Sequence, residues 1–166
     1  MEKSNIVLIG MPGCGKSTVG VVLAKALGYE FIDSDLKIQA RERRLLCEII
    51  EQEGLEGFRR IEEEVNASLD AEGAVIATGG SVIYGPRAMA HLREIGTVVY
   101  LKLPLPEVAE RLGDLTRRGV SLRPGQTLED LYRERTPLYE QYADITIEES
   151  GLEIRQVVAA VLSRKE

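Results

Sequence analysis

A glycine-rich segment near the N-terminus constrains this chain more than any other feature. Residues 10–17 read GMPGCGKS and match the pattern GxxxxGK[ST]. The β-branched run Asn5–Ile9 precedes them, and apolar residues recur with helical spacing over Lys16–Leu27. A loop of this kind between a strand and a helix surrounds a phosphate with backbone amides. The sequence therefore predicts a nucleotide phosphate site, and an ordinary glycine turn that caps a helix is the plainer alternative.

Individual residues of this loop have separate expected roles. Lys16 is expected to reach the β- and γ-phosphates of ATP, and the Ser17 hydroxyl to ligate Mg²⁺. Cys14 occupies a position where the pattern accepts any residue, so we interpret it as a small filler and not as a nucleophile. The predicted nucleotide-binding residues of this segment are Gly13, Cys14, Gly15, Lys16, Ser17 and Thr18.

Strands and helices alternate along the whole chain. Strands are predicted at 5–9, 29–32, 74–77, 97–103 and 145–147. Helices are predicted at 16–27, 36–52, 55–69, 86–95, 106–112, 128–142 and 152–163. The alternation indicates a three-layer α/β/α fold, in which helices cover both faces of a parallel sheet. Ligands of such sheets bind at the carboxyl ends of the strands.

Length and composition restrict the classes of function. A chain of 166 residues that is 44% hydrophobic fits one domain over 1–166. The net charge of -6 argues against a protein that mainly holds a nucleic-acid backbone. The N-terminal apolar run is too short for a membrane span and lacks the flanks of a signal peptide, which predicts a cytoplasmic protein without a membrane partner. Cys14 and Cys47 form no CxxC pair, so we expect reduced thiols and no structural metal.

An aspartate pair closes the second predicted strand. Alternate residues of a strand face the same way, so Asp33 and Asp35 would both lie beside the phosphate loop. One can hold the Mg²⁺ hydration shell while the other orients an acceptor hydroxyl or accepts its proton. An exposed turn or a helix cap is the alternative for this pair. A GTPase would need an NKxD stretch, and neither Asn5 nor Asn66 is followed by lysine.

Three further features point to a small anionic acceptor. Arg59 and Arg60 lie on a predicted helix, the turn Thr78-Gly79-Gly80-Ser81 follows the third strand, and Arg135 lies on the helix at 128–142. Guanidinium groups bind carboxylates in a fork, and glycines let a ring approach the main chain closely. Each arginine has a plain alternative, because the first two could pair with Glu62–Glu64 on the helix surface and the third could be solvated.

Taken together, these motifs resemble the shikimate kinase family, within the nucleoside monophosphate kinase-like superfamily. The resemblance covers nearly the whole chain and rests on residues 10–17, 32–35, 54–62, 78–80 and 135–144. It implies a P-loop NTPase fold with a five-stranded parallel sheet in the order 2-3-1-4-5. It also implies that the protein phosphorylates a hydroxyl of shikimate with ATP and Mg²⁺ to give 3-phosphoshikimate. We expect a monomer.

The resemblance also assigns roles to individual residues. The implied catalytic residues are Lys16, Asp35 and Arg118. The implied acceptor-binding residues are Asp35, Arg59, Gly79, Gly80 and Arg135, with helices at about 34–70 on the acceptor side. The implied nucleotide-binding residues outside the loop are Arg111, beside the adenine, and Arg118, on a lid at about 113–126. The implied magnesium ligands are Ser17 and Asp33.

Two departures from the family pattern fall around the acceptor. Ser81 stands where the family has a third glycine, and the residues after Arg118 in the predicted lid read GVS. Arg123 and Pro124 could be a displaced version of the family's lid motif. An alternative acceptor is therefore another small hydroxylated acid or amino acid, such as homoserine. A nucleotide-binding regulatory module without turnover is the third hypothesis.

Overall fold

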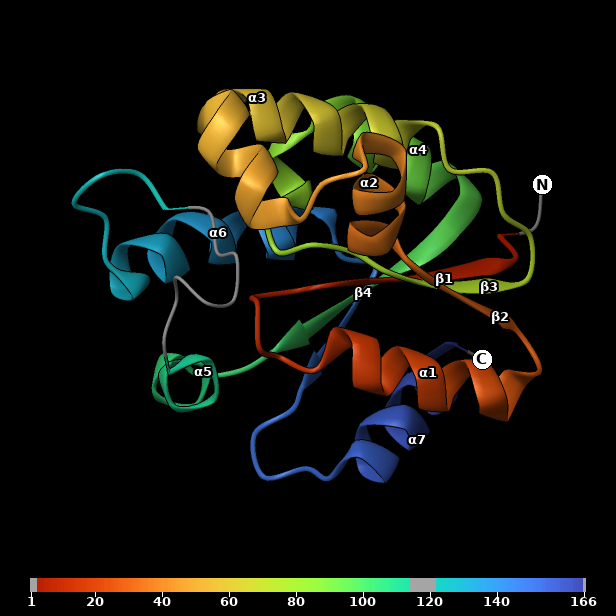
Figure 1. Ribbon diagram of the computed structural model, residues 1–166. Coiled ribbons are helices and arrows are strands. Elements are labelled where there is room, and N and C mark those ends of the chain that lie inside the picture. The colour runs from red at the N-terminus through yellow and green to blue at the C-terminus, as the bar shows by residue number, and fades with distance from the viewer. Residues whose placement is uncertain (1–2, 114–121, 166) are drawn as a thin grey trace.

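The protein is built on one parallel sheet of five strands (Figure 1). The computed structural model describes residues 3–113 and 122–165. The strands are β1 (Asn5–Ile9), β2 (Glu30–Asp33), β3 (Ala74–Ala77), β4 (Gly96–Lys102) and β5 (Ile145–Glu148). Their order is β2-β3-β1-β4-β5 and every pairing is parallel, which confirms the predicted topology. The phosphate loop therefore leaves the central strand of the sheet.

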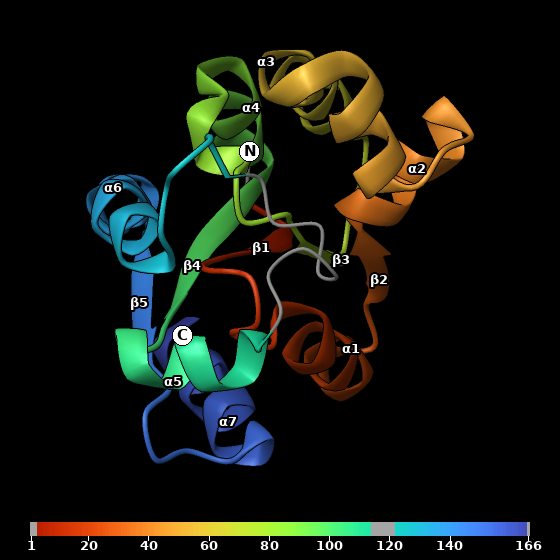
Figure 2. The ribbon, with the colours of Figure 1, turned by 60° about the vertical axis from the view of Figure 1, so that its left-hand side comes forward.

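Helices cover both faces of the sheet, as the alternation predicted (Figure 2). On one face lie α1 (Lys16–Leu27) and α7 (Ile154–Lys165), which contact each other. On the other face lie α3 (Leu46–Ala67) and α4 (Pro86–Ile95), with α2 (Ser34–Glu42) packed on α3. The remaining helical elements are η1 (Val82–Tyr84), α5 (Leu105–Leu112) and α6 (Leu128–Tyr142). Among the described residues, we find no helix with the length and apolar character that a bilayer crossing requires.

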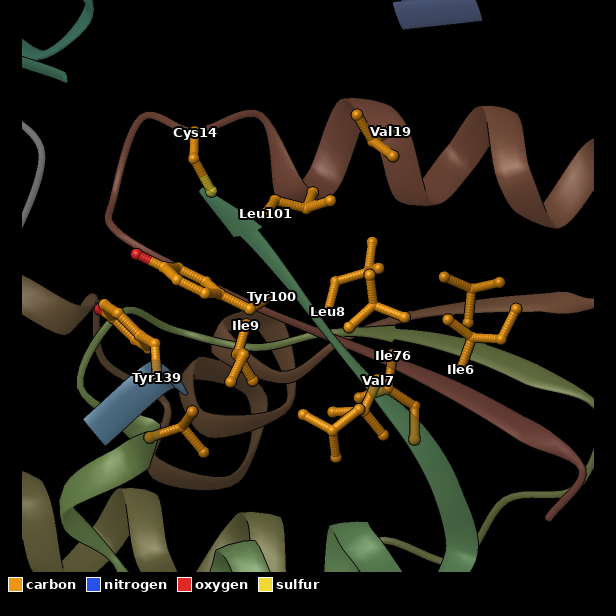
Figure 3. Close-up of a cluster of buried hydrophobic side chains, with 14 of the residues drawn as sticks. Ile6, Val7, Leu8, Ile9, Cys14, Val19, Ile76, Tyr100, Leu101 and Tyr139 are labelled. Carbon is orange, nitrogen blue, oxygen red and sulfur yellow. The ribbon is translucent and has the colours of Figure 1, made fainter. Parts of the chain in front are cut away.

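The core explains why the central strands read as continuous apolar runs. All five residues of β1 are buried, as expected for a parallel strand covered on both faces. Figure 3 shows that Leu8 and Leu101 lie on the face of the sheet that is covered by α1, the helix that carries Val19. Tyr100 of β4 stacks on Tyr139 of α6 with ring centroids 5.0 Å apart, which fixes α6 against the sheet.

The helix predicted over 36–52 is wrong, because two helices occupy this segment. Asp33 caps α2 by accepting hydrogen bonds from the amides of Asp35 and Leu36, so the helix begins earlier than predicted. It ends at Glu42, because Arg43 adopts the left-handed conformation with φ of 54°. The next helix, α3, runs through the predicted break, where Gly54 makes a kink with φ of 74° and ψ of 176°.

Candidate active site

The phosphate loop depends on its glycines. Gly10, Gly13 and Gly15 have φ of 150°, 82° and 86°, a region that L side chains rarely adopt. A Cβ at Gly10 would also lie only 2.7 Å from the carbonyl oxygen of Leu101. The loop therefore packs directly on β4 at Gly10, where a side chain would not fit.

Lys16 is enclosed by this loop. The residue is only 7% exposed, and its ammonium group donates hydrogen bonds to the carbonyl oxygens of Gly10 at 2.7 Å and Met11 at 2.9 Å. The Sγ atom of Cys14 lies 3.6 Å from Lys16 Nζ. Burial raises the pKa of the Cys14 thiol, which keeps it protonated and poorly nucleophilic.

Ser17 and Asp33 bring the start of α1 to the end of β2. The Ser17 hydroxyl donates a hydrogen bond to Asp33 Oδ2 at 3.2 Å, while Asp33 Oδ1 caps α2. The helix-cap alternative therefore describes one oxygen of this carboxylate, and the other oxygen faces the phosphate loop. A hydroxyl and a carboxylate oxygen are the hard ligands that Mg²⁺ takes, so the pair fits a magnesium ion.

Asp35, in the first turn of α2, lines a cavity together with Lys16 and Ser17. Burial raises the pKa of its carboxyl group to about 6; the nearby charge of Asp33 raises it further, whereas Lys16 opposes the shift. A carboxylate with a pKa near neutrality can accept a proton from a reacting hydroxyl close to physiological pH.

One cavity is lined by residues of the phosphate loop and by residues predicted to bind the acceptor. Its lining includes Lys16 and Ser17 from the loop and α1, Asp35 from α2, and Gly79 and Gly80 from the turn after β3. These residues come from three separate parts of the sequence. Parallel strands place all three at the same edge of the sheet, as the fold class predicted.

The turn after β3 has no room for side chains at its two glycines. A Cβ at Gly79 would lie 2.7 Å from Asp35 Oδ1 and 2.8 Å from Glu62 Oε2. A Cβ at Gly80 would lie 2.8 Å from Pro12 Cδ and 2.9 Å from Arg135 Nη1. Both positions therefore allow a close approach between the main chain and charged side chains.

Glu62 is a buried member of the site that the sequence reasoning did not identify. The residue is 2% exposed, and its Oε1 accepts a hydrogen bond of 2.6 Å from the hydroxyl of Ser81. Burial raises the pKa of Glu62 to about 7, an effect that the Ser81 hydrogen bond reduces and the charge of Asp35 increases. The alternative of a surface ion pair between Glu62 and the arginines is therefore wrong. The sequence signal for Glu62 was its position three residues after Arg59 on a predicted helix, which puts the two side chains on the same helix face.

The Ser81 side chain points to Glu62. The residue does not line the cavity that holds Asp35 and Gly79. An effect of Ser81 on this cavity would therefore pass through Glu62.

Two arginines converge on the other side of the glycine turn. Arg135 of α6 is 1% exposed, so the solvated alternative is wrong for this residue. Arg59 of α3 is half-buried, whereas the neighbouring Arg60 is exposed. The guanidinium carbon of Arg59 lies 3.8 Å from the ring centroid of Tyr84, and that of Arg135 lies 5.5 Å from it. The two guanidinium groups thus share one aromatic neighbour.

A second cavity lies behind the phosphate loop. Its lining includes Gly15, Thr18, Arg111 and Glu149, and Arg111 donates to the carbonyl oxygen of Gly13 at 3.4 Å. Glu149 is 3% exposed, and burial raises its pKa to about 7, with Arg111 and Lys16 opposing. No motif pointed to Glu149 in the sequence. Both cavities are lined by Gly15 and Thr18, so this one borders the phosphate loop as the first one does.

The predicted lid is only partly described. Arg118 lies in 114–121, outside the described residues. Arg123 is exposed and lies 3.7 Å from Glu134 of α6 as an ion pair.

Comparison with known proteins identifies the family. The shikimate kinase family model matches residues 12–166. The chain belongs to the shikimate kinase family. Curated shikimate kinases from Thiobacillus denitrificans and Methylococcus capsulatus are 39% and 40% identical to it, over 96% and 99% of this chain and 87% and 94% of theirs.

Solved shikimate kinases share the fold as well. The shikimate kinase from Acinetobacter baumannii, in complex with shikimate, has a TM-score of 0.87 and 36% identity, covering 98% of this chain and 93% of its own. The shikimate kinase from Aquifex aeolicus has a TM-score of 0.79 and 32% identity, covering 96% of this chain and 94% of its own. The family resemblance predicted from the motifs is thereby confirmed.

Proposed function

We propose that this protein transfers the γ-phosphoryl group of ATP to a hydroxyl of shikimate, giving 3-phosphoshikimate and ADP. The proposal is carried by one observation: Lys16, Asp35 and the Gly79-Gly80 turn line the same cavity. Membership of the shikimate kinase family and the relative with shikimate bound support the choice of acceptor.

On the phosphate side, the loop amides bind the β-phosphate and Lys16 stabilises the charge that develops on the transferred group. Ser17 and Asp33 would hold Mg²⁺, which would neutralise phosphate charge when bound. Arg111 flanks the adenine in the second cavity, and Arg118 contributes a further positive charge from the lid.

On the acceptor side, Asp35 orients the attacking hydroxyl and takes its proton. The hydroxyl oxygen forms a bond to the γ-phosphorus, and the bond from that phosphorus to the β,γ-bridging oxygen breaks to release ADP. Arg59 and Arg135 bind the acceptor carboxylate, and Gly79 and Gly80 let the ring approach the main chain. The pKa of Asp35, about 6, supports its role as the proton acceptor.

The Ser81 hydroxyl donates to Glu62 and does not line the cavity that holds Asp35 and Gly79. Its position therefore gives no support to homoserine, the alternative acceptor that Ser81 and the lid sequence suggest. A regulatory module without turnover would not require Lys16, Ser17, Asp33 and Asp35 together beside one acceptor space.

The same proposal covers the chain as a whole. It describes a single kinase domain over 1–166, monomeric and cytoplasmic, with acceptor helices at about 34–70 and a lid at about 113–126. It includes no nucleic-acid or membrane partner.

The test is ADP release by the full chain with MgATP and shikimate, homoserine or no acceptor. Shikimate should stimulate ADP release well above the rate without acceptor. The matched variant Asp35→Asn keeps the size of the side chain but accepts no proton, and should lower kcat by about 10²- to 10⁴-fold. If homoserine stimulated ADP release and shikimate did not, shikimate would be refuted as the acceptor. No stimulation by any acceptor, with ATP binding confirmed by calorimetry, would favour the regulatory module.

A further inference from the structure

We propose that Tyr84 is a positioning residue of the acceptor site, whose ring holds the guanidinium groups of Arg59 and Arg135 in place to bind the acceptor carboxylate. This inference rests on the proposed function, because it assumes an anionic acceptor. No sequence motif assigned a role to Tyr84.

The position of Tyr84 between two helices is the first observation. Tyr84 ends η1, the short helix that follows the Gly79-Gly80 turn and contacts both α3 and α6. Arg59 comes from α3, with its guanidinium carbon 3.8 Å from the ring centroid, and Arg135 comes from α6, at 5.5 Å. Both distances lie within the range of a cation–π interaction. A single ring therefore fixes two cations that belong to separate elements.

The charges around Arg59 are the second observation. Among residues 3–113 and 122–165, none offers Arg59 a carboxylate within ion-pair distance, and its buried Nε has no hydrogen-bond partner there. Burial lowers the pKa of Arg59; Tyr84 opposes this effect, and the like charge of Arg135 adds to it. A half-buried charge beside a like charge is unfavourable unless a negative group faces it. The negative face of the Tyr84 ring supplies part of that compensation for Arg59, and an acceptor carboxylate would add to it.

The third observation concerns the ring and the hydroxyl of Tyr84 separately. The hydroxyl is buried, and its geometry gives no hydrogen bond to a described residue, although it lies close enough to Arg135 to raise the pKa of that guanidinium. Because the aromatic face contacts both arginines, we assign the role to the ring. The chain therefore offers a matched pair of variants. Tyr84→Phe keeps the aromatic face and removes the hydroxyl, whereas Tyr84→Leu keeps an apolar side chain and removes the face.

Steady-state kinetics of the full chain separate these variants. Tyr84→Leu should raise the KM for shikimate by about 5- to 30-fold, the range expected for loss of a partly desolvated cation–π contact. Tyr84→Phe should stay within about twofold of the wild type, and both variants should keep the wild-type KM for ATP. An unchanged shikimate KM in a folded Tyr84→Leu protein, or equal losses in both variants, would overturn the proposal.

Calorimetry without nucleotide tests whether the effect passes through the carboxylate. The wild type should bind shikimate more tightly than its neutral methyl ester, and Tyr84→Leu should reduce that preference by about the same 5- to 30-fold. A general loss of structure would weaken both ligands equally and would overturn the proposed role. Tighter binding of shikimate by Tyr84→Leu would also overturn it, because the ring would then compete with the ligand for Arg59.

The outcome for Tyr84 is distinguishable from the outcome for the proposed function. A wild-type protein that neither binds nor phosphorylates shikimate would refute the function itself. A wild-type protein that phosphorylates shikimate, with an acid-to-ester preference that Tyr84→Leu leaves intact, would refute only the role of Tyr84.

Discussion

Replacing Glu62 with glutamine removes a buried ionisable group and keeps the shape of the side chain. The pKa of Glu62 rises from its ordinary value of 4.5 to about 7 because the carboxyl group is buried. Below pH 4.5 the group is protonated in the folded and unfolded chains alike. Between about pH 4.5 and 7 the unfolded chain ionises first, so the folded protein loses stability as the pH rises. The pKa difference corresponds to a contribution of about 3 kcal/mol to the free energy of unfolding, which is present below about pH 4.5 and fully lost above about pH 7.

Glu62→Gln stays neutral over this range, so its stability relative to the wild type should increase by about 3 kcal/mol between pH 4.5 and pH 8. Urea unfolding at several pH values, without metal or substrate, measures the difference. Glu149 titrates in the same direction, but it is present in both proteins and cancels in the comparison. Asp35 interacts with Glu62, so the measured difference includes the repulsion between these two carboxylates.

Glu64→Gln is the control on the same helix. The side chain of Glu64 is 43% exposed, and its hydrogen bond with Arg41 lowers its pKa. The stability of Glu64→Gln relative to the wild type should therefore fall slightly as the pH rises, the opposite of the effect of Glu62→Gln. A stability difference between Glu62→Gln and the wild type that does not change with pH would refute the account of Glu62.

Three further predictions concern the site. Lys16→Ala should lower kcat by at least about 100-fold without loss of the fold, because the hydrogen bonds of Lys16 to described residues all go to the loop; kinetics and thermal melting check both parts. Arg59→Ala should raise the KM for shikimate by about 10- to 150-fold and spare that for ATP, while Arg60→Ala, at an exposed position, should change neither. Gly80→Ala should destabilise the protein by about 1 to 3 kcal/mol, because the new Cβ meets the rigid ring of Pro12, and urea unfolding measures the loss.

The architecture was predictable because strand and helix patterns in this chain are strong. The five strands lie within a few residues of their predicted positions, and buried parallel strands leave a continuous apolar signal. The break between α2 and α3 was not predictable. No glycine or proline marks it, and Arg43 takes a left-handed conformation that is uncommon for a residue with a Cβ.

Some site residues belong to contiguous motifs, and others come together only through tertiary packing. The phosphate loop and the Thr78-Gly79-Gly80 turn are contiguous motifs, so their chemistry is visible in the sequence. Glu62 lies in a helix rich in glutamate and resembles a solvated surface residue until η1 packs against it and Ser81 reaches it. Tyr84 has no local signal, because its partners come from α3 and α6. Glu62 does have one, since it lies three residues after Arg59 in the segment 54–62 on which the family resemblance rests, but its burial and its contact with Ser81 depend on tertiary packing.

Phosphorus NMR of the full chain with MgATP and shikimate tests the central claim most directly. The account predicts that a phosphomonoester signal grows in step with ADP, and that inorganic phosphate stays at the level found without acceptor. The Lys16→Ala protein, run in parallel, should form neither product at a comparable rate. Formation of ADP and inorganic phosphate with no phosphomonoester would contradict the account, because the protein would then hydrolyse ATP without transferring the phosphoryl group to shikimate.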